Sequence, residues 1–97
     1  MHSHQVTFRV TCTADDPQAP ARVMGVFASR SLLPHRYFCS LGEAGLLDIE
    51  VKVSLAEDEG TGPCHLARLI ARFPVVLSVE LFVDGSRTPF EVGAVSA

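Results

Sequence analysis

The chain has 97 residues, of which 47% are hydrophobic and 20% are charged, and its formal net charge at pH 7 is −3. This composition excludes a disordered chain, and the length suits one small domain with a two-layer core. The eight Lys and Arg residues are scattered, which argues against a nucleic-acid partner. No apolar run reaches the ~20 residues of a membrane helix, and the first residues lack a signal-peptide pattern. We therefore expect a cytoplasmic protein without a membrane partner.

The three cysteines, Cys12, Cys39 and Cys64, are widely spaced and include no C-x-x-C pair. A disulfide framework requires paired cysteines in a secreted chain. We therefore expect free thiols that behave as small apolar side chains.

The segment from residue 5 to residue 12 alternates apolar and polar side chains, which predicts a half-buried strand. Residues 14–20 follow with turn and helix-start signals. The helix begins either with Asp16 as N-cap and Pro17 as its first residue, or at Pro20. In both cases residues 21–31 are predicted to be helical, and Pro34 ends the pattern. The expected buried face holds Val23, Val26 and Phe27, with Arg30 at its edge.

Residues 37–41 and 47–55 predict two strands of an antiparallel hairpin around a Gly-containing turn at 42–45. An acidic loop at 56–62 leads to a second helix, which begins near Pro63 and ends before Pro74. Its expected apolar face consists of Leu66, Leu69, Ile70 and Phe73.

The last predicted strand covers residues 75–83. Leu77, Val79, Leu81 and Val83 are expected on its core side, and Ser78, Glu80 and Phe82 on the other side. The element order predicts an α+β, ferredoxin-like βαββαβ fold, a four-stranded antiparallel sheet with two helices on one face. We expect one domain over residues 4–84 and a weakly patterned C-terminal tail at 85–97.

The sheet face without helices carries the clues to function, because many proteins share this architecture. An RNA-binding module needs aromatic residues on its central strands, but here Asp48 and Glu50 stand where phosphates would approach. His2 and His4 do not make a metal site by themselves, and we expect them in a disordered tail. No acid, base and nucleophile come together in a motif. We expect no catalytic residue, no metal and no cofactor.

Exposed aromatic residues on that face predict protein association. Phe82 points away from the core in this scheme, and so does Tyr37 or Phe38. Together with an edge strand whose backbone groups are unpaired, these residues predict association with another polypeptide. We assign Phe82, Glu80 and Tyr37 to the interface. The alternative is that the residues after Asp84 fold back and cover this face.

The segment Arg22-Val23-x-Gly25-x-Phe27-x-x-Arg30 resembles a helix in the ACT domain of the small, regulatory subunit of acetolactate synthase (acetohydroxyacid synthase). That family has the helix pattern x-L-x-R-V-x-G-L-F-x-x-R-G after its first strand. Residues 4–6 and Pro17 are similar to the short, single-domain form of the subunit. The resemblance covers about residues 4–83.

This resemblance implies a non-catalytic subunit that dimerises through its ACT sheets. It would bind and activate the large, thiamine-diphosphate-dependent catalytic subunit of acetolactate synthase, in branched-chain amino acid biosynthesis. In the family a branched-chain amino acid, usually valine, binds through backbone amides of the loop after the first strand. The corresponding effector positions here are Asp15, Asp16, Pro17, Gln18, Ala19 and Leu33.

The effector loop departs from the family pattern, because Asp15 and Gln18 stand where the family has asparagine and glycine. A Cβ at Gln18 hinders close approach of a ligand, and Asp15 and Asp16 repel a carboxylate. The sequence therefore predicts weak valine binding. Two alternative functions stay open: a free-standing ACT-like module that binds an amino acid or a protein, and a small enzyme on the same fold. The sequence offers no perturbed acid or base for the enzyme.

Overall fold

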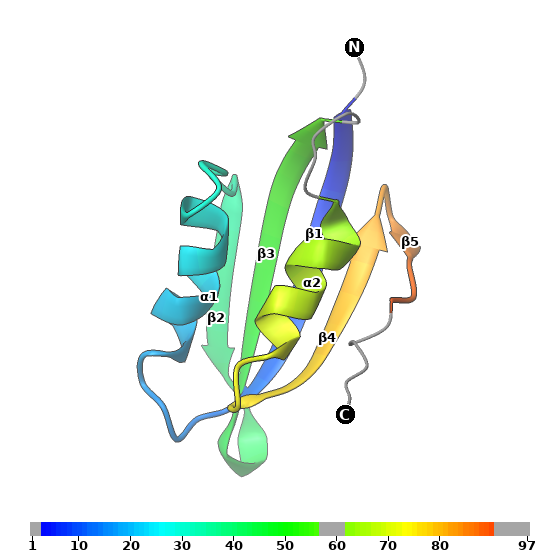
Figure 1. The fold of residues 1–97 in the computed structure, drawn as a ribbon. Helices are drawn as coiled ribbons and strands as arrows, with labels where there is room; N and C mark the ends of the chain where they lie inside the picture. The colour runs from blue at the N-terminus through cyan, green and yellow to red at the C-terminus, as the bar shows by residue number, and fades with distance from the viewer. Residues whose placement is uncertain (1–2, 57–61, 91–97) are drawn as a thin grey trace, which may run out of the picture.

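The computed structural model describes residues 3–56 and 62–90 of the chain. It shows an antiparallel sheet with strand order β2-β3-β1-β4-β5 and two helices on one face (Figure 1). The predicted α+β, ferredoxin-like fold is confirmed, and one short strand is added to the sheet. The elements are β1 (Ser3–Thr13), α1 (Ala19–Ala28), β2 (Arg36–Leu41), a 3₁₀ turn η1 (Glu43–Gly45), β3 (Leu46–Ala56), α2 (Pro63–Ala71), β4 (Val76–Val83) and β5 (Ser86–Arg87).

β1 lies at the centre of the sheet because it pairs with β3 on one side and with β4 on the other. Phe8 stands opposite Val51 of β3 and Leu81 of β4, and all three side chains are buried. The predicted alternation of β1 and β3 is confirmed, since a period of two places every second side chain under the helices. The buried residues of these two strands are Val6, Phe8, Val10, Cys12, Ile49, Val51, Val53 and Leu55.

The two helices close the core over this face. Phe27 of α1 meets Phe8 edge to face, with ring centroids 5.2 Å apart, a favoured aromatic geometry. α2 buries Leu66, Ala67 and Ile70, whereas the predicted Leu69 and Phe73 are only partly buried. Neither helix in the described part of the chain is long and apolar enough to cross a membrane.

The bounds of α1 differ from the prediction. The helix begins at Ala19, so Pro20 lies in its first turn, where a missing N–H breaks no helical bond. It ends at Ala28, because Ser31 has a positive φ of 59° that the helix cannot continue through. The predicted end at residue 31 was wrong, and Arg30 lies outside the helix and is exposed.

A β-bulge in β4 corrects another prediction. Thr11 pairs with Ser78 but Cys12 pairs with Val76, so Leu77 is the extra residue. Val76 packs against the core, whereas Leu77 is 57% exposed. The sequence placed Leu77 on the core side because strict alternation was assumed along the whole strand.

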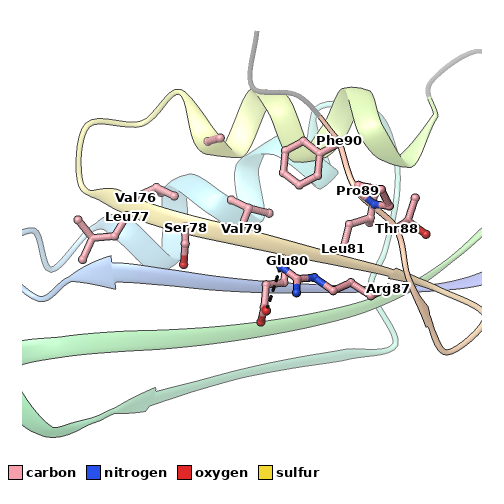
Figure 2. A pocket seen from close by; sticks show the side chains of 11 residues that line it. Val76, Leu77, Ser78, Val79, Glu80, Leu81, Arg87, Thr88, Pro89 and Phe90 are labelled. Atoms are coloured by element: carbon pink, nitrogen blue, oxygen red, sulfur yellow. Dashed lines mark ion pairs between the residues drawn. The ribbon is translucent and has the colours of Figure 1, made fainter.

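The first residues of the predicted C-terminal tail form a turn and a short strand, β5. Asp84 and Gly85 both have positive φ, 50° and 86°, which makes a tight two-residue hairpin turn and returns the chain as β5. The Thr88 amide donates to the Leu81 carbonyl at 2.7 Å. Phe90 packs on the helix side of β4, next to α2 (Figure 2). The described C-terminal residues therefore leave the other face of the sheet uncovered, and the rest of the predicted tail lies outside the described residues.

Candidate functional site

The uncovered face is organised around Arg9 at its centre. Arg9 pairs in register with Glu50 on β3 and with Glu80 on β4, and its guanidinium lies 5.9 Å from the centroid of the Phe82 ring. Phe82 and Glu80 thus point away from the helices, as the alternation predicted. Glu80 also forms an ion pair with Arg87 of β5 at 3.6 Å. A second ion pair on this face joins Arg36 to Glu50 at 3.5 Å. The interface role of Phe82 and Glu80 stays a prediction.

Tyr37 does not lie on the uncovered face, so its placement there was wrong, whereas its role at an interface stays a prediction. It stands opposite the buried Val51, and its hydroxyl donates a hydrogen bond to the Pro20 carbonyl. Burial raises the pKa of this hydroxyl, which therefore stays protonated. Its neighbour Phe38 takes the outer position and is 52% exposed. The sequence left the choice open because both residues are aromatic; the hydroxyl contact decides it.

The edge formed by β2 combines unpaired backbone with exposed apolar side chains. β2 is the end strand of the described sheet, so its outer N–H and C=O groups face no other strand of the described chain. Among the described residues, four large hydrophobic side chains are exposed: Leu33, Phe38, Leu41 and Leu77. The first three lie on β2 or in the segment leading into it. Exposed edge strands usually carry lysine, proline or a bulge that prevents pairing, and β2 has only Arg36 at its start.

Leu33 and Leu41 are interface candidates that sequence reasoning missed. Leu33 is 86% exposed and Leu41 is 71% exposed. Leu41 carried a usable signal, because it ends a strand beside a turn where no helix covers it. The sequence around Leu33 gave no signal of its exposure, since an apolar residue after a helix normally packs back onto the core.

In the predicted effector loop, Asp16 accepts the hydrogen bonds that a ligand carboxylate would otherwise accept. Asp16 Oδ1 accepts the Gln18 amide at 2.9 Å, and the Asp16 carbonyl accepts the Ala19 amide at 3.0 Å. Asp16 Oδ2 also pairs with Arg22 Nε at 3.3 Å. The amides of Gln18 and Ala19, at the start of α1, are thus already hydrogen-bonded to Asp16 rather than open to a ligand carboxylate. Ala19 is buried, whereas Asp15, Pro17 and Gln18 are exposed. The prediction of weak valine binding stays a prediction.

Leu33 lies away from that loop within one chain. The loop precedes the first residue of α1 and Leu33 comes after its last, so a ten-residue helix about 15 Å long stands between them. The structure therefore does not bring all the predicted effector positions together in a single chain.

His4 belongs to a strand rather than to a disordered tail. Its Nδ1 lies 2.7 Å from Asp84 Oδ2. Asp84 Oδ1 accepts the Gln5 amide at 3.0 Å, and the Asp84 amide donates to the Gln5 carbonyl. These bonds to His4 and Gln5 lower the pKa of Asp84. The other predicted tail residue, His2, lies outside the described residues. In the described ranges, no three His, Cys, Asp or Glu side chains come together as metal ligands.

The three cysteines are free, as predicted, but they differ in environment. Cys12 is buried, Cys64 is half-buried and Cys39 is exposed. Loss of water around the sulfur is the main cause that raises the pKa of both Cys12 and Cys39, even though Cys39 as a whole residue is exposed. Because the thiolate is the reactive form, neither residue is activated as a nucleophile at neutral pH.

Comparison with known proteins supports the fold. No family model matches the chain, and no curated protein matches it. Among solved structures, it is similar to the C-terminal domain of the MgtC protein from Mycobacterium tuberculosis, with a TM-score of 0.67 and 13% identity over 84% of this chain and 88% of that one. It is also similar to the ACT domain from GTP pyrophosphokinase of Chlorobium tepidum, with a TM-score of 0.67 and 11% identity over 84% of this chain and 100% of that one.

These likenesses define an ACT-like fold for this chain. At such low identities they concern the fold alone. Neither structure is an acetolactate synthase subunit, so the finer resemblance rests on the α1 motif.

Proposed function

We propose that this chain is a non-catalytic, ACT-like regulatory module that works by associating with other polypeptides. The observation that carries the proposal is the concentration of exposed apolar side chains at β2, whose outer backbone groups pair with no described strand. An edge of this kind is a template for pairing with another strand, and exposed apolar groups beside it favour association.

The first partner in this proposal is a second copy of the chain. Two β2 strands pair antiparallel and join the two sheets into one, which produces an isologous dimer. β2 has one charged residue, Arg36 at its start, and the antiparallel arrangement sets it near the apolar end of the partner strand. No like charges then face each other across the contact.

The test compares two exposed leucines. Leu41→Lys places a charge at the β2 edge, and Leu77→Lys places the same charge at the bulge of β4, where the leucine is similarly exposed. We expect light scattering to give a dimer for the wild type and for Leu77→Lys, and a monomer for Leu41→Lys. A wild-type monomer at high concentration would contradict the proposal, and so would a Leu41→Lys dimer.

The finer part of the proposal is that the partner regulated by this module is an acetolactate synthase catalytic subunit. Its support is the α1 motif. Val23 and Phe27 of that motif are buried in the core, whereas Arg22, Gly25 and Arg30 are exposed. The core explains the first pair but not the exposed residues, which are available to a partner.

Reconstitution tests this finer part. Adding the purified chain to an acetolactate synthase catalytic subunit from the same source should raise its turnover, and the two chains should co-purify. Arg30→Ala should reduce the activation, while Arg87→Ala on the uncovered face serves as the charge-matched control. Unchanged turnover together with separate elution would overturn the assignment to this enzyme and leave the dimer test unaffected.

A further inference from the structure

A groove of about 420 Å³ runs along the outer surface of the helix layer, between α1 and α2. The α1 side contributes Arg22, Gly25 and Arg30, and the α2 side contributes Leu69, Arg72 and Phe73. Arg30 follows the end of α1 and Arg72 follows the end of α2. Because the two helices run in opposite directions (Figure 1), these arginines stand toward opposite ends of the groove.

The groove is positively charged although the chain as a whole is negative. Three arginines line it, and none of its lining residues is acidic. Arg22 is paired with Asp16 at 3.3 Å, whereas the guanidinium of Arg30 donates, among the described residues, only to the neighbouring Ser29 hydroxyl at 3.2 Å. Over residues 3–56 and 62–90, neither Arg30 nor Arg72 forms an ion pair. Arginine stays protonated at physiological pH, so both charges are available to an anion.

The middle of the groove is apolar and open. Val26, Leu69 and Phe73 form its apolar lining. Gly25 lies beside them within a helix, where glycine is less stable than alanine. Its φ is not positive, and a Cβ built there would meet nothing within 4 Å. Neither the backbone conformation nor packing within the described residues requires glycine at this position. An absent side chain here does leave room for another backbone to approach closely.

We propose that this groove binds an acidic segment of a partner protein. Carboxylates of the segment bond to Arg30 and Arg72, and an apolar side chain between them packs on Leu69. Guanidinium–carboxylate pairs are among the strongest charge-assisted hydrogen bonds. A peptide uses the charges, the apolar lining and the space above Gly25, whereas a small anion uses only the charges. The groove shares no residue with the β2 edge, so this inference goes beyond the proposed dimer and stands without it.

The experiment measures peptide binding to the full chain by fluorescence anisotropy and by amide NMR shifts. The probe is a short labelled peptide in which Glu–Leu–Glu is repeated, and the control peptide has Gln in place of each Glu. At low salt, we expect the acidic peptide to bind about tenfold more tightly than the Gln control peptide. The amides of Gly25, Ser29 and Leu69 should shift, and those of β2 should not.

Variants locate the site. Arg30→Ala and Arg72→Ala should each weaken binding about tenfold, while Arg87→Ala, on the other face, should leave it unchanged. Gly25→Ala should raise the Tm by about 3 °C because alanine favours a helix, and should weaken binding because its methyl group enters the groove. The gain in Tm separates lost binding from lost folding.

Three outcomes would overturn the inference. The first is equal affinity for the acidic and the Gln peptides. The second is unchanged binding in both Arg30→Ala and Arg72→Ala. The third is that inorganic phosphate alone, at the same concentrations, produces the same shifts at Gly25 and Leu69, which would assign the groove to a small anion.

Discussion

β1, with eleven residues, and β2, with six, each carry four hydrophobic residues, but the two sets differ in burial. Four of the six residues of β2 are hydrophobic, yet none of them is fully buried. β1 also carries four hydrophobic residues, and all four are at most 1% exposed. The difference is position, because β1 lies between two strands beneath both helices, whereas β2 lies at the edge. Apolar residues that the chain's own core does not use are the ones available to a partner.

The largest expected difference between β1 and β2 is in the free energy of unfolding when a phenylalanine of each strand is replaced by alanine. Phe8→Ala removes a buried ring that contacts Phe27 and should lower the free energy of unfolding by about 3–5 kcal/mol. Phe38→Ala should change it by less than about 0.5 kcal/mol, because Phe38 is half exposed. Urea denaturation of the dilute chain measures both. Equal losses would contradict the contrast between the core strand and the edge strand.

A smaller loss of stability is expected when the hydrogen bond between Tyr37 of β2 and Pro20 of α1 is removed. Tyr37→Phe removes the hydroxyl that donates to the Pro20 carbonyl and should lower the free energy of unfolding by about 1 kcal/mol. The reciprocal change, Phe38→Tyr, adds a hydroxyl on the uncovered face and should be neutral. The urea midpoints of the two variants provide the comparison. A neutral Tyr37→Phe would show that the hydroxyl bond does not fix the orientation of β2.

The smallest expected effect concerns the opposite edge, where Asp84 joins the β4–β5 turn to β1. The folded state lowers the pKa of Asp84, so this group stabilises the fold above its unfolded pKa of about 3.9. That contribution is lost as the pH falls through the lower, folded-state pKa. Asp84→Asn should therefore be less stable than the wild type at pH 7, and the difference should shrink in acid. Urea midpoints measured across pH test this, with Asp15→Asn as the charge-matched control.

The sequence was sufficient for the parts of the fold that burial controls. The alternation of β1 and β3 and the apolar faces of both helices follow from the need to cover one sheet face, so the element order was predictable. The bulge at Leu77 was not, because Val76 and Leu77 are equally apolar and only the pairing with Thr11 and Cys12 selects between them. β5 was missed for a related reason, since two polar residues pair with β4 through their backbone alone.

The candidate site was less predictable than the fold. Phe82 and Glu80 were placed on the correct face by alternation, but Tyr37 was not, because its hydroxyl bond to Pro20 joins elements distant in sequence. The exposure of Leu33 and Leu41 depends on how far α1 extends over the sheet. The groove beside Gly25 likewise arises only when two helices pack together, and no local pattern signals it.

Amide hydrogen exchange along β2, measured at low and at high protein concentration, tests the central claim most directly. If a second copy pairs with this edge, amides of residues 36–41 should gain protection as concentration rises, while β1 amides stay protected throughout. Leu41→Lys should remove the gain and Leu77→Lys should keep it. Exchange at β2 that stays fast and independent of concentration would contradict the account.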